Sequence, residues 1–352
     1  MTNPQYPHHY SVTSSHGSQD NSSTSQSSKH NKSSSISNPS SSQSPTNSGL
    51  DVETVASDAV SYVSSTASEF DYVIQDGRAL LVGSNSLLPQ DLEEFDRADM
   101  SHGVLKYLCR TNHVAPLPWN THRIFEMGCG SGLWCKEMAL EFPRAEIIGC
   151  DMTEAGFRDP EEMPPNVILE YGNILEGLKY MDEEFDYTHQ RAIWAIPTKD
   201  WPRTLDTLYR ITAPMGTCEV AEAIGMCYPP DHPVCAKINR WVIEAHAYRG
   251  IDLRDGARIA SMMDEAGFVH VREVNVNIPF GEWKGIPGRV MSRSWLRFLN
   301  GVRTSPKGRE MPETEFRQML ADLEAEMSNP YGLKIYCPMY FVFGRRPAPG
   351  WR

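Results

Sequence analysis

The sequence "RIFEMGCGSGLW", at residues 123–134, places three glycines at alternate positions directly after a short apolar stretch. Glycine adopts positive φ angles readily and lets the backbone come close to a bound molecule. An acid, Glu126, stands two residues before the first of these glycines. The three glycines are Gly128, Gly130 and Gly132. The pattern predicts a turn that binds a nucleotide, and the alternative is a tight turn without a ligand.

The order of the acid and the glycines favours one class of nucleotide. The dinucleotide fingerprint is GxGxxG, and here Leu133 stands at the place of its third glycine. A pyrophosphate also requires N–H donors with no carboxylate nearby, whereas a carboxylate suits a cationic amine. S-adenosylmethionine (SAM) carries such an amine, a sulfonium and no phosphate. Glu126 therefore favours SAM, with a solvated or capping acid as the alternative.

A second acid has the spacing of a ribose ligand. Asp151 follows the next apolar stretch, "EIIGC", about twenty residues beyond the glycines, and an acid at that position accepts hydrogen bonds from ribose hydroxyls. NAD and SAM both carry those hydroxyls, so Asp151 fits either cofactor. The choice of SAM therefore depends on Glu126.

Three further residues are candidates for the chemistry. Methyl transfer from a sulfonium is an in-line displacement that depends mainly on alignment, and a base helps when the acceptor is a protonated amine or hydroxyl. His189 and Arg191 lie at the end of a later apolar stretch, and Glu222 ends the one after it. We expect His189 to act as a base or to orient the acceptor, and a packed or capping histidine is the alternative.

The elements that must position these residues alternate between strands and helices. Apolar stretches predict strands at 123–128, 146–151, 167–174, 185–193 and 217–223. Helical spacing predicts helices at 89–110, 134–142, 201–212 and 253–268, and period-two alternation predicts antiparallel strands at 269–280 and 334–346. This alternation is typical of a mostly parallel sheet covered by helices on both faces. The glycine turn then lies at the carboxyl edge of the sheet, where ligands bind.

Composition divides the chain into three regions. Residues 1–60 are rich in Ser, and such a segment cannot bury enough apolar surface to fold, so we expect it to be disordered. We interpret 61–120 as a helical lead-in and 121–352 as the catalytic core. No run of 18 apolar residues is present, so no transmembrane segment is expected.

Charge and cysteine usage exclude other classes of protein. The net charge of −12 argues against direct nucleic-acid binding, which needs a basic face. The eight cysteines are scattered and none forms a CxxC pair, so we expect reduced thiols in an intracellular protein and no metal site.

Several further motifs stand out along the chain, namely "DGR" at 76–78, "PQDLEEFDRADMSH" at 89–102, "FDYTHQR" at 185–191, "DWPRTLDTLYRITAPMG" at 200–216 and "DEAGF" at 264–268. Together they resemble the LaeA-like fungal group of class I SAM-dependent methyltransferases. The resemblance implies a Rossmann-like sheet of seven strands whose last strand is antiparallel. It also implies the positions that contact SAM, which are Glu126, Gly128, Cys129, Gly130, Gly132, Asp151, Met152, Asn173, Ile174 and His189.

The resemblance also implies a biological role. Within this group the velvet-interacting methyltransferases of the VipC and VapB type are similar, which implies a regulator of fungal development and secondary metabolism in the nucleus and cytoplasm. Its methyl acceptor would be a protein. Its partners would be velvet-type regulators, a related methyltransferase or an adaptor that recruits it to a membrane. The alternatives are an enzyme that tailors small natural products and a docking module with little catalysis. The docking module is favoured by "ALLVGS" at 79–84, where the family commonly has Tyr-His-x-Tyr.

One segment near the C-terminus combines aromatic and basic residues. Residues 281–302 read "GEWKGIPGRVMSRSWLRFLNGV" and interleave Trp295 and Phe298 with three arginines. Such residues are common anchors of protein interfaces. The pattern predicts a lid, a dimer surface or a partner site, and the alternative is a helix packed on the sheet.

Overall fold

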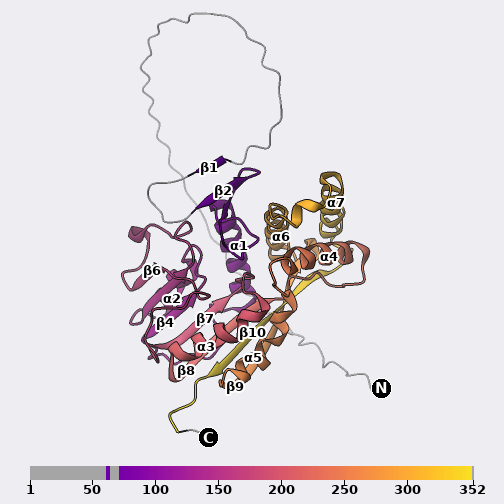
Figure 1. Ribbon diagram of the computed structural model, residues 1–352. Coiled ribbons are helices and arrows are strands. Elements are labelled where there is room, and N and C mark those ends of the chain that lie inside the picture. The colour runs from indigo at the N-terminus through magenta and orange to yellow at the C-terminus, as the bar shows by residue number, and fades with distance from the viewer. Residues whose placement is uncertain (1–60, 64–70, 351–352) are drawn as a thin grey trace, which may run out of the picture. The chain divides into compact units, whose positions relative to one another are not determined.

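The computed structural model describes residues 61–63 and 71–350, and its main feature is a seven-stranded sheet (Figure 1). The strand order is β6-β5-β4-β7-β8-β10-β9. Strands β4 to β8 pair in parallel, and β10 is antiparallel to both of its neighbours. The strands are β4 (Arg123–Met127), β5 (Glu146–Asp151), β6 (Val167–Tyr171), β7 (Phe185–Arg191), β8 (Thr212–Ala223), β9 (Val269–Phe280) and β10 (Ile335–Arg345). The expected fold class is confirmed.

Both faces of the parallel strands are buried, which explains why they read as continuous apolar runs. In β4, Phe125 packs with α3 and α5 on one face and Ile124 packs with α2 on the other. The helices α4, α6 and α7 gather at the β9 end of the sheet (Figure 1). The helices are α1 (Leu92–Cys109), α2 (Leu133–Glu141), α3 (Trp201–Ile211), α4 (Pro233–Ala247), α5 (Ile259–Glu265), α6 (Ile286–Arg303) and α7 (Glu313–Ser328).

Short 3-10 helices account for one difference from expectation. The helix expected over 253–268 begins as the 3-10 helix η3, so α5 starts only at Ile259. The helices α4 and α7 were not predicted. The 3-10 helices are η1 (Pro160–Glu162), η2 (Thr198–Asp200), η3 (Leu253–Arg258), η4 (Glu282–Lys284) and η5 (Gly308–Glu310).

The "DGR" motif is a hairpin turn that is bonded to α1. A second sheet has the order β1-β2-β3, with β1 (Ser61–Val63), β2 (Tyr72–Gln75) and β3 (Arg78–Leu81). Asp76 and Gly77 join β2 to β3, both with positive φ, as tight hairpins require. The next residue, Arg78, donates two hydrogen bonds of 2.7 and 2.8 Å to Asp91. Asp91 caps the N-terminus of α1 by accepting from the Glu94 N–H at 3.1 Å.

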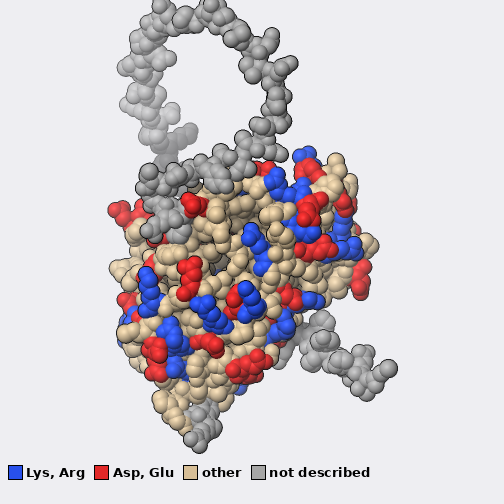
Figure 2. Space-filling model, viewed as in Figure 1, with Lys and Arg blue, Asp and Glu red and all other residues tan. Residues whose placement is uncertain are grey.

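The expected domain boundaries at residues 60 and 120 stay predictions, and the N-terminal region falls outside the described residues. In the described part of the chain, no helix is both long and apolar enough to cross a membrane. Basic and acidic side chains are interspersed on the face shown in Figure 2.

The aromatic residues of α6 belong to the core. Trp295 is 3% exposed and Phe298 is fully buried, while Arg289, Arg293 and Arg297 on the other face are exposed. Phe298 packs against Trp194 and Trp295 with ring centroids 4.7 Å apart in each pair. The expectation that these aromatic side chains anchor a partner is wrong, because the helix is amphipathic and buries them against the sheet.

We expect Phe298→Ala to lower the free energy of unfolding by about 3–5 kcal/mol, because it removes a buried ring and leaves a cavity. Arg293→Ala, on the exposed face of the same helix, should change it by less than about 0.5 kcal/mol. Chemical denaturation of both variants measures this difference. Equal stability of the two variants would contradict the assignment of α6 to the core.

Candidate functional site

The glycine turn connects β4 to α2 and folds back across the end of β5. The N–H groups of Gly128 and Cys129 donate to the Cys150 carbonyl at 2.7 and 3.2 Å. Three residues of the turn have positive φ, namely Gly128 (70°), Gly130 (55°) and Gly132 (76°). A side chain is strained in this backbone conformation, and glycine is not.

The three glycines differ in what a side chain would meet. A Cβ at Gly128 would lie 2.7 Å from Ile193 Cγ1, and one at Gly132 would lie 2.6 Å from Leu169 Cδ1. At Gly130 the nearest atom, Phe95 Cδ1, is 3.9 Å away. Packing within the protein therefore requires two of the glycines, whereas Gly130 faces open space.

Two cavities meet at this turn. Cavity A has a volume of about 190 Å³ and is bordered by the turn together with Asp151, Met152, Asn173 and Ile174. Cavity B has a volume of about 160 Å³. It is bordered by the turn and by Glu126, Cys129, Ser131, His102 and Arg191. Residues that border both cavities are Arg97, Ala98, Gly128, Gly130 and Ala192. The two cavities therefore form adjoining parts of one site.

Asp151 and Asn173 present polar groups to cavity A. Asp151 accepts from the Gly130 N–H at 2.8 Å and the Thr153 N–H at 3.3 Å. Burial raises the pKa of Asp151 to about 6. The Asn173 amide oxygen accepts from the Leu175 N–H at 3.0 Å, and a carbonyl oxygen can accept a second hydrogen bond.

Glu126 is a buried acid at cavity B with few contacts. Within residues 71–350 its side chain accepts one hydrogen bond, from the Cys135 thiol at 3.1 Å, and its Oε1 lies 3.5 Å from His189 Nδ1. Burial raises the pKa of Glu126 to about 8, although the charge of Arg191 favours the ionised form. A cation that entered cavity B beside Glu126 would stabilise its ionised carboxylate.

His189 does not lie at the open end of its strand, so the expected position is wrong. Its side chain is fully buried and stacks on Trp134 with ring centroids 4.1 Å apart. Neither ring nitrogen makes a hydrogen bond to a described residue, although Nδ1 lies 3.5 Å from Glu126 Oε1, and burial lowers the pKa of His189. It borders neither cavity. This geometry supports the alternative of a packed histidine.

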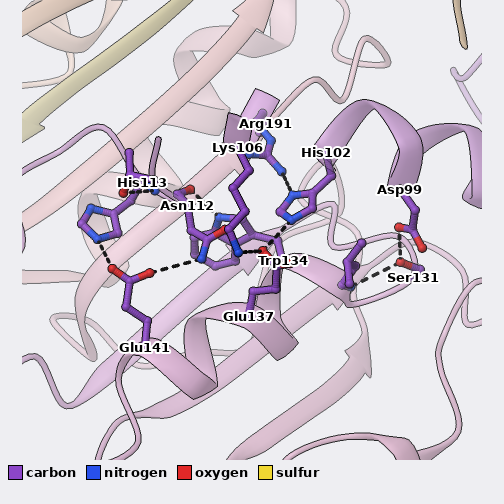
Figure 3. A network of polar contacts seen from close by, with 12 residues as sticks. Asp99, His102, Lys106, Asn112, His113, Ser131, Trp134, Glu137, Glu141 and Arg191 are labelled. Atoms are coloured by element: carbon purple, nitrogen blue, oxygen red, sulfur yellow. Dashed lines mark hydrogen bonds and ion pairs between the residues drawn. The ribbon is translucent and has the colours of Figure 1, made fainter. Parts of the chain in front are cut away.

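Arg191 and Glu222, the other two candidates for the chemistry, lie in different places: Arg191 borders cavity B and Glu222 does not. Arg191 borders cavity B and donates to His102 Nδ1 at 2.6 Å (Figure 3). Glu222 is buried outside both cavities, where it accepts from Gln190 Nε2 at 2.5 Å and from the Ile193 N–H at 3.0 Å. Glu222 is therefore not placed to reach an acceptor in cavity B.

Helix α1 contributes polar residues that sequence reasoning did not assign to the site. Asp99 borders cavity B and accepts from Ser131 Oγ at 2.6 Å (Figure 3). Arg97 forms a 2.7 Å ion pair with Glu94, whose side chain is buried. Charged residues on the inward face of a helix are unusual. The charged positions on the apolar face of this helix were the sequence feature that could have indicated a role for Arg97 and Asp99 in the site.

The remaining wall of cavity B is mainly apolar. Ile278 and Phe280 of β9, Met291 and Trp295 of α6 and Met339 of β10 border the space opposite the turn. These elements follow the parallel strands in sequence. The N-terminal half of the described chain therefore supplies the glycine turn, and the C-terminal half closes the cavity on the other side.

Comparison with known proteins agrees with this arrangement. The family described as "Methyltransferase domain" matches residues 124–216. The secondary metabolism regulator LAE1 of Cochliobolus heterostrophus is 29% identical over 216 residues, 57% of this chain and 68% of that protein. The methyltransferase pytC of Aspergillus terreus is 28% identical over 225 residues, 61% of this chain and 67% of that protein. The N-methyltransferase tcpN of Claviceps purpurea is 25% identical over 275 residues, 72% of this chain and 94% of that protein.

The matched domain begins in β4 and contains the whole glycine turn. The relatives include a regulator of secondary metabolism and methyltransferases. From the strand order, the glycine turn and these matches, the chain is a methyltransferase with a class I fold that depends on S-adenosylmethionine, and it is similar to LaeA-type regulators and to secondary-metabolism methyltransferases.

Proposed function

We propose that SAM binds across the glycine turn, with its adenosine in cavity A and its amino-acid part in cavity B. Asp151 can accept from the ribose hydroxyls, and Asn173 borders the space for the adenine. Glu126 presents an acid without a cationic hydrogen-bond partner to cavity B, where the amine would lie. Gly130 leaves room for the ligand between the two cavities. When bound, SAM supplies an electrophilic methyl group on a sulfonium.

We propose further that the chain regulates fungal development and secondary metabolism as part of a velvet-type assembly, with a protein as methyl acceptor. It would act in the nucleus and cytoplasm, and a related methyltransferase or a membrane-tethering adaptor could join it. Similarity to the regulator LAE1 over 216 residues supports this role. The chain's contribution to catalysis would be to align an acceptor atom with the sulfonium at the turn.

A second candidate function is favoured by the shape of cavity B. Its far wall consists mainly of apolar side chains from β9, α6 and β10, and its volume is about 160 Å³. Such a space suits a small apolar acceptor as well as a single protein side chain. The relative tcpN, an N-methyltransferase by name, supports a nitrogen atom as methyl acceptor.

The segment that departs from the family pattern takes part in the site. Within and just after "ALLVGS", Gly83, Asn85 and Ser86 border cavity A, and Ser84 Oγ lies 3.8 Å from Met152 Sδ. The segment thus supplies a wall for the proposed cofactor. This placement favours an active enzyme over a docking module.

Gly130→Val should abolish SAM binding, because its side chain would enter the space between the cavities. Gly77→Val is the matched control, since Gly77 also has positive φ (77°) and no neighbour within 4 Å. It lies in the β2–β3 turn and borders neither cavity. Both variants bear a similar backbone penalty, so calorimetry with SAM isolates the cavity effect. Equal SAM affinity in the two variants would refute this placement.

At pH 7 SAM binding should release about one proton, because the ligand's ammonium lowers the raised pKa of Glu126. The free carboxyl, with a pKa of about 8, is mostly protonated at this pH. SAM affinity should therefore rise with pH up to about 8. Calorimetry in phosphate and Tris, which differ in ionisation enthalpy, measures the release. Glu126→Gln should remove it, and a heat independent of buffer in the native protein would contradict the assignment.

Transfer of radioactive methyl from SAM to components of a native fungal extract tests the proposed function. Label in the protein fraction supports the regulatory methyltransferase, and label in the organic extract supports the small-molecule enzyme. Gly130→Val is the control for labelling by other enzymes in the extract. No label above that control in either fraction would exclude both enzymatic functions and favour the docking module.

A further inference from the structure

Two groups at cavity B, the Arg191 guanidinium and the Glu126 carboxyl, have no oppositely charged partner in ion-pair contact within the described residues. Arg97 pairs with Glu94, and Arg158 pairs with Asp99 at 2.5 Å. Arg191 also borders the cavity, but within residues 71–350 it forms no ion pair with a carboxylate. Within the same residues, Glu126 accepts a hydrogen bond only from a thiol, and the His189 ring 3.5 Å from it is neutral because burial lowers the pKa of His189.

Arg191 and Glu126 lie on the same face of the sheet. They belong to the neighbouring strands β7 and β4, where Glu126 pairs with His189, two residues before Arg191. Side chains two residues apart on a strand point to the same face. Both residues border cavity B, so the cavity presents one positive and one negative group side by side.

We propose that Arg191 binds the α-carboxylate of SAM while Glu126 binds its α-ammonium, and that His102 is the positioning residue for Arg191. An amino acid is a zwitterion, and its two charges are matched by adjacent groups of opposite sign. The guanidinium binds carboxylates well because it offers several N–H donors in one plane. This inference rests on the SAM site proposed above and assigns the residues that recognise one end of the cofactor.

His102 is held as a neutral ring with its proton on Nε2, the form that can accept a hydrogen bond from Arg191. Its Nε2 lies 2.9 Å from Glu137 Oε2, and Lys106 also donates to Glu137 at 2.7 Å (Figure 3). Burial and the charge of Arg191 lower the pKa of His102 to about 4. The neutral ring therefore donates from Nε2 to Glu137 and accepts from Arg191 at Nδ1. One guanidinium N–H is thereby fixed, and the other donors remain for a ligand.

Decarboxylated SAM tests this proposal directly, because it keeps the sulfonium and the amine and lacks only the carboxylate. The native protein should bind SAM about 10- to 150-fold more tightly than decarboxylated SAM, as expected for a charged hydrogen bond. Arg191→Met should bind both ligands with equal affinity, at the level of decarboxylated SAM in the native protein. Calorimetry gives all four affinities without reference to catalysis.

Variants of His102 test its positioning role. His102→Ala should reduce the preference for SAM over decarboxylated SAM by about 2- to 12-fold, the range for one ordinary hydrogen bond. His102→Asn should restore it, because the Asn amide oxygen can take the place of Nδ1. His113→Ala is the matched control, since His113 pairs with Glu141 at 3.1 Å in the neighbouring network and borders neither cavity (Figure 3).

The outcomes separate this inference from the site on which it rests. A native protein that binds neither ligand would remove the proposed SAM site itself. An Arg191→Met variant that keeps the full preference for SAM would overturn the inference and leave the site intact, and an acceptor carboxylate would then be the partner of Arg191. Loss of both ligands in that variant would show that Arg191 shapes the whole site, which also contradicts a specific carboxylate contact.

Discussion

The reversal of the chain at the glycine turn is the constraint on which the rest of the site depends. Strand β4 is an interior strand of the sheet, and its chain must turn into α2 while the Gly128 N–H donates to the Cys150 carbonyl. That path requires positive φ at three residues. The turn lies beside the end of β5, where Asp151 accepts a hydrogen bond from the Gly130 N–H. Glu126, near the end of β4, borders cavity B next to the same turn.

The buried acids of this sheet differ in how their charge is satisfied. Glu219, on β8, accepts hydrogen bonds from the Val114 and Ala115 N–H groups and from the Tyr187 hydroxyl at 3.0 Å. Glu126, two strands away, is also buried, and among the described residues it accepts a hydrogen bond only from a thiol, with the His189 ring 3.5 Å away. A buried acid without adequate donors costs stability unless a ligand supplies the missing charge. We therefore interpret Glu219 as structural and Glu126 as a binding group.

The sequence predicts the parallel part of the sheet and the turn because both follow from local patterns. Apolar runs mark strands buried on both faces, and an alternating glycine motif after such a run marks the carboxyl edge. The positions of Asp151 and Asn173 beside cavity A follow from the same rule, since the ends of parallel strands share one edge.

Other parts of the site depend on tertiary packing that local patterns do not encode. His189 stands near a strand end, but the stacked Trp134 covers it. The aromatic residues of α6 are of types common in both protein interfaces and protein cores. They are buried because α6 packs against the sheet, which the local sequence does not reveal. The roles of Arg97, Asp99 and His102 depend on how α1 packs over the turn, to which the β2–β3 hairpin contributes through Arg78 and Asp91.

A crystal structure of the protein with S-adenosylhomocysteine is the most direct test of the central claim, which is that the cofactor lies across the turn between the two cavities. The account predicts ribose hydroxyls on Asp151, adenine beside Asn173 and the amino-acid group between Glu126 and Arg191. A ligand that lies in the reverse direction, or away from Gly130, would contradict it.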